Sequence, residues 1–140
     1  MKYILDTNII SELINSNPNP KVLNFLNTLK EKDIYLSSIT IGEIYFGIQK
    51  LPHGKKQKKL LAWVEEQLIP RFHNKVIDID TDVMLHWAVL TNILKTQGTP
   101  LPIMDSLIGA TCLAKKFTLV TRNEKDFKNI DIKIINPFYL

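Results

Sequence analysis

The beginning of the chain constrains its fold most, because it places a carboxylate directly between an apolar run and a helix. Residues 3–5 (Tyr-Ile-Leu) form an aromatic and aliphatic run that is short enough to be a buried strand of a parallel sheet. Asp6 follows this run at once, and apolar residues then recur at helical spacing over 9–14. A carboxylate at the carboxyl end of a strand lies where open α/β sheets form their ligand crevice. The alternative is that Asp6 only caps the helix, as Asp often does.

The rest of the chain repeats this alternation of strand and helix. We predict further strands over 34–36, 76–79, 117–120 and 132–135. Helices are predicted over 9–14, 21–30, 55–68, 81–97 and 103–115. Another helix ends near Gln49, and Ser37, Ser38 and Thr40 are the candidates for its N-cap. No internal repeat or long linker divides the 140 residues. The sequence therefore predicts one domain, residues 1–140, with an α/β sandwich fold and a mainly parallel central sheet.

Composition narrows the environment and the partners. The 18 Lys and Arg residues exceed the 14 Asp and Glu residues, giving a net charge of +4 that is compatible with a polyanionic partner but does not establish one. No apolar run approaches the ~20 residues that span a membrane. The chain enters its first strand after one lysine, which leaves no room for a signal peptide. The one cysteine, Cys112, cannot form an internal disulfide and is predicted to be a small core residue. We therefore expect a cytoplasmic protein with no membrane partner.

Four acidic or amide side chains are expected at one edge of the sheet. Asp6 follows a strand, and Asn123 lies just beyond the strand predicted over 117–120. Glu43 and Asp105 are each predicted in the first turn of a helix. In a right-handed βαβ arrangement these junctions share the edge where the strands end. Converging carboxylates repel one another unless a cation lies among them, and oxygen ligands without Cys or His favour Mg²⁺ or Mn²⁺.

An acid cluster around Mg²⁺ suits the hydrolysis of a phosphodiester, and the residues argue against other chemistries. The five glycines form no phosphate-binding loop, and the three histidines have no zinc-ligand spacing. Ser37, Ser38 and Ser106 lack the surroundings of a nucleophile elbow. A haloacid-dehalogenase-like phosphatase with Asp6 as its nucleophile would need a second Asp two residues on, where this chain has Asn8.

Several of these side chains also have an ordinary structural explanation. Glu43 in a first turn is favoured by the helix dipole even as a solvated charge. The four lysines of 55–59 either contact phosphates or simply form the solvated start of a helix. In the helix over 81–97 the spacing predicts an inner face made of six residues: Val83, Met84, Trp87, Ala88, Thr91 and Leu94.

Ordered motifs along the whole chain resemble the PIN-domain ribonucleases, most nearly the VapC and FitB type of bacterial toxin. The motifs are DTNIISEL from Asp6, YLSSITIGEI ending just after Glu43, MDSLIGA over 104–110 and TLVTRN over 118–123. The lysine-rich GKKQKK and the terminal NPF also fit. Each motif is weak alone, whereas the ordered set is specific. The resemblance implies a PIN-like α/β/α sandwich with a mainly parallel central sheet.

The resemblance also implies roles for individual residues. The catalytic acids that bind the metal correspond to Asp6, Glu43 and Asp105. Supporting groups orient these acids by hydrogen bonds. In this chain they correspond to Thr7, Asn8 and Thr121. Contacts with RNA are expected from five basic residues, which are Lys55, Lys56, Lys58, Lys59 and Arg122.

The chain departs from the family pattern at the fourth acidic position. Many relatives have Asp where this chain has Asn123, whose side chain offers a carbonyl oxygen but no charge. Asp126, three residues on, is the alternative supporting acid. The sequence leaves open which of the two completes the site, and with it whether the site holds one metal ion or two.

The resemblance implies a specific function. The chain is expected to be the toxin of a type II toxin–antitoxin pair, an endoribonuclease that uses Mg²⁺ or Mn²⁺ and a metal-activated water to cleave RNA, often tRNA. It is expected to form a homodimer and to be neutralised by a small antitoxin protein whose tail covers the acidic pocket, within a larger complex on operator DNA. The alternative is a binding module, a non-catalytic partner of a DNA-binding antitoxin in a repressor complex. The sequence does not specify the RNA target, the cleavage site or the antitoxin.

Overall fold

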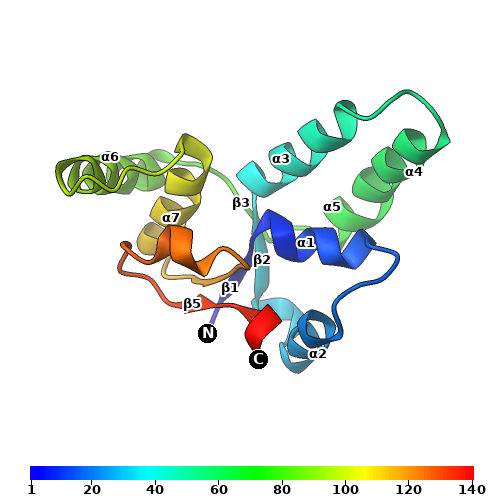
Figure 1. Cartoon of the computed structure of the whole chain (residues 1–140), viewed down its shortest axis with the longest axis horizontal. Coiled ribbons are helices and arrows are strands. Elements are labelled where there is room, and N and C mark those ends of the chain that lie inside the picture. Colours follow the sequence, from blue (N-terminus) through cyan, green and yellow to red (C-terminus); the bar gives the residue numbers. More distant parts are fainter.

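Five short parallel strands form the central sheet of the computed structural model, which describes all residues 1–140 (Figure 1). The spatial order of the strands is β3-β2-β1-β4-β5. Their bounds are β1 (Tyr3–Leu5), β2 (Ile34–Ser37), β3 (Val76–Ile77), β4 (Thr118–Val120) and β5 (Ile134–Ile135).

Helices connect these strands and cover both faces of the sheet. The α-helices are α1 (Thr7–Ile14), α2 (Pro20–Thr28), α3 (Ser38–Gln49), α4 (Lys55–Trp63), α5 (Ile69–Arg71), α6 (Thr81–Thr96) and α7 (Ile103–Lys115). A π-helical turn, η2 (Val64–Leu68), joins α4 to α5. Short 3-10 turns are η1 (Glu31–Asp33), η3 (Glu124–Phe127) and η4 (Pro137–Tyr139). The predicted α/β sandwich with a parallel sheet is confirmed.

The central strand β1 has neighbours that come from distant parts of the sequence. It pairs with β2 on one side and with β4 on the other, where Leu5 lies beside Val120. The backbone N–H of Asp6 donates to the carbonyl of Val120 at 2.9 Å, one residue beyond this last pair. The strand order reverses at this point, and ligand crevices form where parallel strands end at such a reversal. The fold therefore places Asp6 in the expected crevice.

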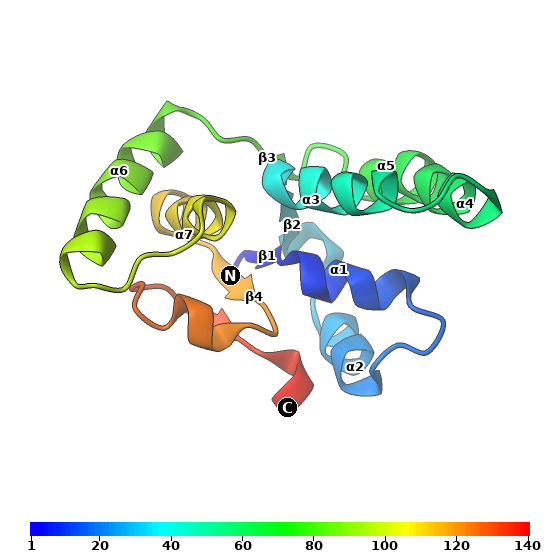
Figure 2. The ribbon, with the colours of Figure 1, turned by 45° about the horizontal axis from the view of Figure 1, so that its top comes forward.

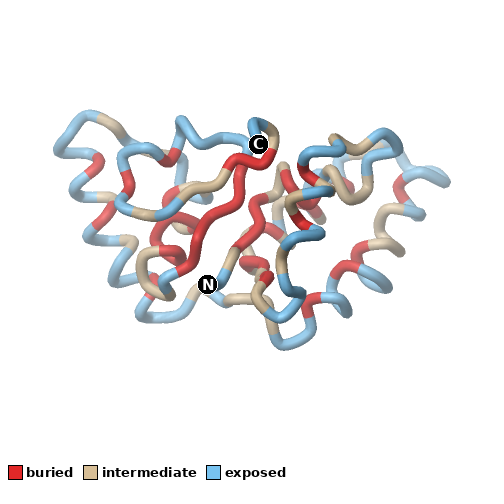
Figure 3. Tube along the Cα trace, turned by 90° about the horizontal axis from the view of Figure 1, so that it is seen from below, coloured by how far each residue is buried: buried red, intermediate tan, exposed pale blue.

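The sheet separates two hydrophobic cores, because successive residues of a strand point to opposite faces. Leu5 and Val120 belong to a core under α1, α2 and α3, whereas Ile4 and Leu119 belong to a core under α6 and α7. Figure 2 shows α6 and α7 on one side of the strands and α1 to α5 on the other. In Figure 3 the buried residues gather in the middle of the molecule, and the outer parts of the helices are exposed.

The structure corrects the predicted inner face of α6. Met84 is 41% exposed and Ala88 is exposed as well, so placing these two residues in the core is wrong. The helix packs on α7 along a narrower strip, at the edge of which Trp87 Nε1 donates a hydrogen bond to Ser106 Oγ at 2.8 Å. The spacing of apolar residues on α6 was misleading because this helix carries apolar residues on its solvent side too.

Several element ends also differ from the predicted ones. α2 ends at Thr28 because Leu29 leaves the helical conformation, with φ −91° and ψ 148°. β3, β4 and β5 each begin or end one or two residues inside the predicted runs. Cys112 is buried, as predicted. None of the helices combines the length and the apolar character that crossing a bilayer requires.

Candidate active site

Three hydrogen bonds hold the carboxylate of Asp6 at the end of β1, where the residue is 5% exposed. Oδ1 accepts from the backbone N–H of Thr7 at 2.8 Å. Oδ2 accepts from Thr121 Oγ1 at 2.8 Å and from Asn8 Nδ2 at 3.3 Å. Asp6 is therefore the N-cap of α1. Its second oxygen accepts two further hydrogen bonds that a helix cap does not require. Burial raises the pKa of Asp6 more than these hydrogen bonds lower it.

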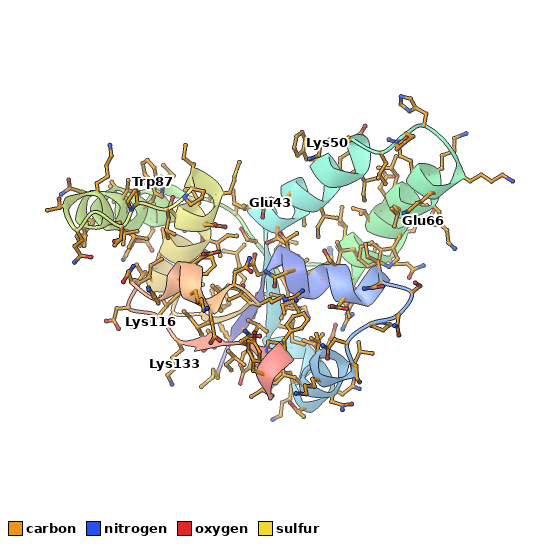
Figure 4. The ribbon with its side chains drawn as sticks, viewed as in Figure 1. Glu43, Lys50, Glu66, Trp87, Lys116 and Lys133 are labelled. Atoms are coloured by element: carbon orange, nitrogen blue, oxygen red, sulfur yellow. The ribbon has the colours of Figure 1, made fainter.

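Thr7 connects Asp6 to the second predicted acid, Glu43. Its backbone binds Asp6, and its Oγ1 donates to Glu43 Oε1 at 2.9 Å. Ser37 caps α3, which places Glu43 in the second helical turn rather than in the predicted first turn. Figure 4 shows Glu43 near the start of α1. The helix dipole, which acts in the first turn, therefore does not explain why an acidic side chain lies at this position. The hydrogen bond that Glu43 accepts from Thr7 does explain it.

Asn8 fixes the segment that follows β4. Its Nδ2 lies 3.3 Å from Thr121 Oγ1, and its Oδ1 accepts from the backbone N–H of Arg122 at 2.9 Å. The backbone N–H of Asn123 donates to Thr121 Oγ1 at 3.0 Å. The structure thus brings all three predicted supporting residues, including Thr7, into one hydrogen-bonded network around Asp6.

Asp105 lies half-buried in the first turn of α7, as predicted. Burial raises the pKa of this carboxyl to about 6, and the negative charges of Asp6, Glu43 and Asp126 add to the effect. Charges act on one another strongly only at short range in water. The charges of the other three acids therefore reach Asp105.

The two candidates for the fourth position differ in their surroundings. Asn123 precedes η3, and its side chain makes no capping hydrogen bond there. Asp126 lies within η3, and its charge raises the pKa values of both Asp6 and Asp105. Of the two, only Asp126 therefore acts on the other acids by charge.

The donor set of the site fits a hard divalent cation by its chemistry. Its candidate ligands are carboxylate oxygens with no Cys or His among them, the set that Mg²⁺ and Mn²⁺ prefer. As the side chains are placed, no group of three His, Cys, Asp or Glu residues is arranged to hold an ion. Carboxylates that face one another without a cation repel. Binding of an ion would therefore have to draw Asp6, Glu43 and Asp105 closer together.

One of the five predicted basic residues shares a cavity with an acid of the site, and a second follows the hydrogen-bonded network in the sequence. Lys56 lines a cavity of about 330 Å³ together with Thr7 and Glu43. Arg122 follows Thr121, and its guanidinium carbon lies 4.8 Å from the centre of the Phe138 ring. The other three lysines, Lys55, Lys58 and Lys59, are exposed on α4.

Lys50 is a basic residue of the site that the sequence analysis missed. It lines a cavity of about 700 Å³ that also contains Glu43 and Phe46. Lys50 lies seven residues after Glu43, which is two helical turns and therefore the same side of α3. That spacing is the sequence signal from which Lys50 could have been found.

Comparisons with known proteins agree with this geometry. The family model of the PIN domain matches residues 3–133. The toxin FitB of Neisseria gonorrhoeae is 33% identical over 97% of this chain and 98% of its own. The VapC ribonuclease Y4jK of Sinorhizobium fredii is 33% identical over 96% of each chain. The tRNA(fMet)-specific endonuclease VapC of Salmonella typhimurium is 30% identical over 93% of this chain and 92% of its own.

A solved complex has nearly the same backbone. The structure of FitAB bound to an IR36 DNA fragment includes a chain that superposes with a TM-score of 0.93 at 33% identity. The match covers 99% of this chain and 96% of that one.

Proposed function

The chain belongs to the PIN-domain family, and on this premise we propose that it is a Mg²⁺-dependent endoribonuclease that acts as the toxin of a toxin–antitoxin pair. The observation that carries the proposal is the hydrogen-bonded arrangement at the end of β1 in which Thr7 joins Asp6 to Glu43. The charge of Glu43 also reaches Asp105, the third acid. Relatives that are named ribonuclease and tRNA-specific endonuclease support RNA as the substrate.

The residues of the site supply orientation and electrostatics. A Mg²⁺ or Mn²⁺ ion held by Asp6, Glu43 and Asp105 would supply positive charge for the scissile phosphate and lower the pKa of a bound water. Thr7 and Thr121 orient the carboxylates of Glu43 and Asp6 by hydrogen bonds, so that the remaining movement on ion binding is small. Water would attack the phosphorus and lose a proton, while the P–O bond to one ribose oxygen breaks and that oxygen takes up a proton. No covalent enzyme intermediate forms.

Basic residues around the acids bring the polyanion to the site. Lys56 lines a cavity with Glu43, and the backbone of Arg122 is held by Asn8, next to Asp6. Their charges offset the repulsion that the acids exert on RNA phosphates, in the manner of other phosphate-binding surfaces. RNA bound there would place a phosphate close to the carboxylates.

The Asp6→Asn variant tests the proposal. Asn keeps the shape of the side chain and removes one charge of the predicted ligand set, so cleavage of total tRNA in Mg²⁺ should be lost while circular dichroism is unchanged. Asp33→Asn is the matched control, because Asp33 precedes β2 at the opposite end of the sheet. Full activity of a correctly folded Asp6→Asn variant would refute the mechanism.

We further propose that a small antitoxin covers this site. A Lys or Arg from its tail would pair with the acids, bidentately if it is Arg. The cavity that contains Lys56 also has apolar walls formed by Ile14, Leu51 and Leu60, which would accept an apolar anchor. Purified with a small antitoxin that binds it, the chain should lose nuclease activity and Mn²⁺ binding together. A stable complex with an open, active site would contradict this.

The DNA-bound FitAB structure favours a second role, as part of a repressor complex on operator DNA. The two roles are separable because only cleavage needs the acids. The Asp6→Asn variant should therefore still join the antitoxin on operator DNA in a gel-shift assay. If the chain supports the DNA complex but cleaves no RNA in any divalent metal, the non-catalytic alternative is the correct one.

We propose that the chain forms a homodimer through the exposed apolar side of α6. Leu85 is 64% exposed, Val89 is 62% exposed and Ile93 is 45% exposed, and these residues line one cavity with Ile130. Leu85→Glu should convert a dimer into a monomer in light scattering, because a charge would be buried unpaired. Ile69→Glu on α5 serves as the control on another helix. An unchanged mass of the Leu85→Glu variant would exclude this face.

A further inference from the structure

The larger of the two cavities beside the acids has an unusual wall. Its volume is about 700 Å³, within the range of small-molecule sites, and one side of α3 forms most of its lining, with Met104 opposite. Glu43 lies between this cavity and the smaller one that contains Lys56. Figure 4 shows Glu43 and Lys50 on the same helix, with Lys50 toward its C-terminal end. A group bound in this cavity would adjoin the catalytic acids.

Two glycines in the middle of α3 open this wall. Gly42 and Gly47 both line the cavity, although glycine destabilises a helix interior relative to alanine. A Cβ added at either position would meet no atom within 4 Å. At Gly109, by contrast, a Cβ would lie 2.6 Å from the side chain of Ile130. Packing within the chain therefore explains Gly109, but it does not explain Gly42 or Gly47.

An aromatic ring stands in the same cavity, open to solvent. Phe46 is 64% exposed, although it is three residues from Glu43 on a helix whose other side is in the core. Lys50 Nζ lies 4.8 Å from the centre of the Phe46 ring. Lys50 takes part in none of the ion pairs of the chain, so its charge is available. An exposed ring beside a free cation is the combination with which proteins bind single-stranded nucleic acid.

We propose that Phe46 is a stacking platform for an unpaired RNA base next to the scissile phosphate, and that Lys50 contacts a neighbouring phosphate. The open surface at Gly42 and Gly47 lets the nucleotide approach the backbone of α3. The inference rests on the proposed nuclease function and adds a recognition rule to it. Every base has a π-face, so this subsite selects single-stranded segments over duplex rather than one base over another.

Binding of two matched probes tests this role. One is a fluorescein-labelled oligoadenylate, and the other is the same ribose-phosphate chain without bases. Affinities are measured by fluorescence anisotropy in Mg²⁺, in the Asp6→Asn background so that the RNA stays intact. Phe46→Ala should weaken oligoadenylate binding about 5- to 100-fold and leave binding of the base-free chain unchanged. Phe46→Leu should weaken oligoadenylate binding as Phe46→Ala does, whereas Phe46→Trp should keep the affinity that Phe46 gives.

Lys50 and Gly42 give two independent readouts. Lys50→Gln should weaken binding of both probes alike and lower the slope of log affinity against log salt by about 0.7. Gly42→Ala should raise Tm by about 2–4 °C, through helix propensity, and yet weaken oligoadenylate binding. A merely structural role of Gly42 would not combine higher stability with weaker binding.

The outcomes separate this inference from the function on which it rests. The platform is refuted if Phe46→Ala leaves oligoadenylate binding unchanged, or weakens the binding of both probes equally. It is also refuted if Phe46→Ala affects only dimer formation or antitoxin binding, since Phe46 would then be a protein contact. If the unsubstituted chain cleaves no RNA and the Asp6→Asn chain binds neither probe, the proposed nuclease function falls together with it.

Discussion

Thr121 Oγ1 donates a hydrogen bond to Asp6 Oδ2 at 2.8 Å, although the two residues are 115 positions apart in the sequence. The bond lies at the point where β1 and β4 end side by side. The same hydroxyl oxygen accepts from the backbone N–H of Asn123, which leads into η3. Thr121, one buried residue, thus orients Asp6 at the end of β1 and fixes the segment that carries Asp126.

Replacing this hydroxyl should cost both stability and activity. Thr121→Val leaves a buried carboxylate oxygen with a weaker set of donors, which we expect to cost about 1–3 kcal/mol in the free energy of unfolding. The hydroxyl lowers the pKa of Asp6, so its loss raises that pKa further. The destabilisation should therefore grow as pH rises through the raised pKa of Asp6 in the folded chain and fade in acid. Chemical denaturation at several pH values measures this.

Thr111 offers a matched control for Thr121. Both threonines are fully buried, but Thr111 Oγ1 donates to the carbonyl of Leu107 within α7, an oxygen that the helix itself already uses. Thr111→Val should cost less and show no such dependence on pH. Equal, pH-independent losses for the two variants would mean that the Thr121 hydroxyl acts only as packing volume.

We expect ionised Asp105 to lower the free energy of unfolding when no metal ion is bound. Its pKa of about 6 in the folded chain exceeds the ordinary 3.8, so folding favours the protonated form. Any stabilising effect of Asp105 is therefore complete below pH 3.8 and is lost as pH rises through about 6. In a chelator, Asp105→Asn should raise the free energy of unfolding at pH 7.5 by about 1 kcal/mol, after allowance for solvent screening of a half-exposed group. The gain should vanish near pH 3.5.

A divalent metal ion should stabilise the unsubstituted chain more than the Asp105→Asn variant. An ion that binds only the folded chain stabilises it by mass action, and Asp105→Asn removes one ligand charge. Mg²⁺ should therefore raise the Tm of the unsubstituted chain more than that of the variant. A variant with no stability gain in chelator at pH 7.5 would contradict the raised pKa of Asp105.

Lys56 should matter more for RNA than the other lysines of α4. It lines a cavity with Glu43, whereas Lys59 is exposed elsewhere on the same helix. Lys56→Gln should raise KM for tRNA cleavage with little change in kcat, and lower the salt slope of RNA binding by about 0.7. Lys59→Gln is the control with the same change in net charge. Equal effects of the two substitutions would indicate long-range attraction rather than a contact at the site.

Local signals were sufficient to predict the centre of the site. Asp6 follows a three-residue apolar strand and opens a helix, so its place at the carboxyl edge of the sheet follows from its immediate neighbours. The sequence does not show which residue joins Asp6 to Glu43, because the bond through Thr7 depends on the packing of α1 on α3. The prediction that Glu43 lies in the first helical turn was wrong, because Ser37, rather than a later residue, is the N-cap of α3.

Surfaces were harder to predict than the site. Periodicity identifies an apolar side of a helix but does not say whether the chain itself covers it, which is why Met84 was misplaced. Periodicity likewise does not predict that Phe46 is exposed, because an aromatic residue in a helix is more often in a core than in a cavity wall. Asp126 lies in a single 3-10 turn, which has no periodic pattern to place its side chain.

The choice between Asn123 and Asp126 yields the last prediction. Asp126 acts electrostatically on both Asp6 and Asp105, whereas Asn123 carries no charge and its side chain makes no capping bond. Hard divalent ions follow charge closely, so Asp126→Asn should weaken Mn²⁺ binding several-fold in calorimetric titrations, and Asn123→Ala should leave it nearly unchanged. Asp33→Asn controls for the change in net charge, because Asp33 precedes β2 at the opposite end of the sheet. If Asn123→Ala instead weakens Mn²⁺ binding and Asp126→Asn does not, the amide of Asn123 is the fourth ligand.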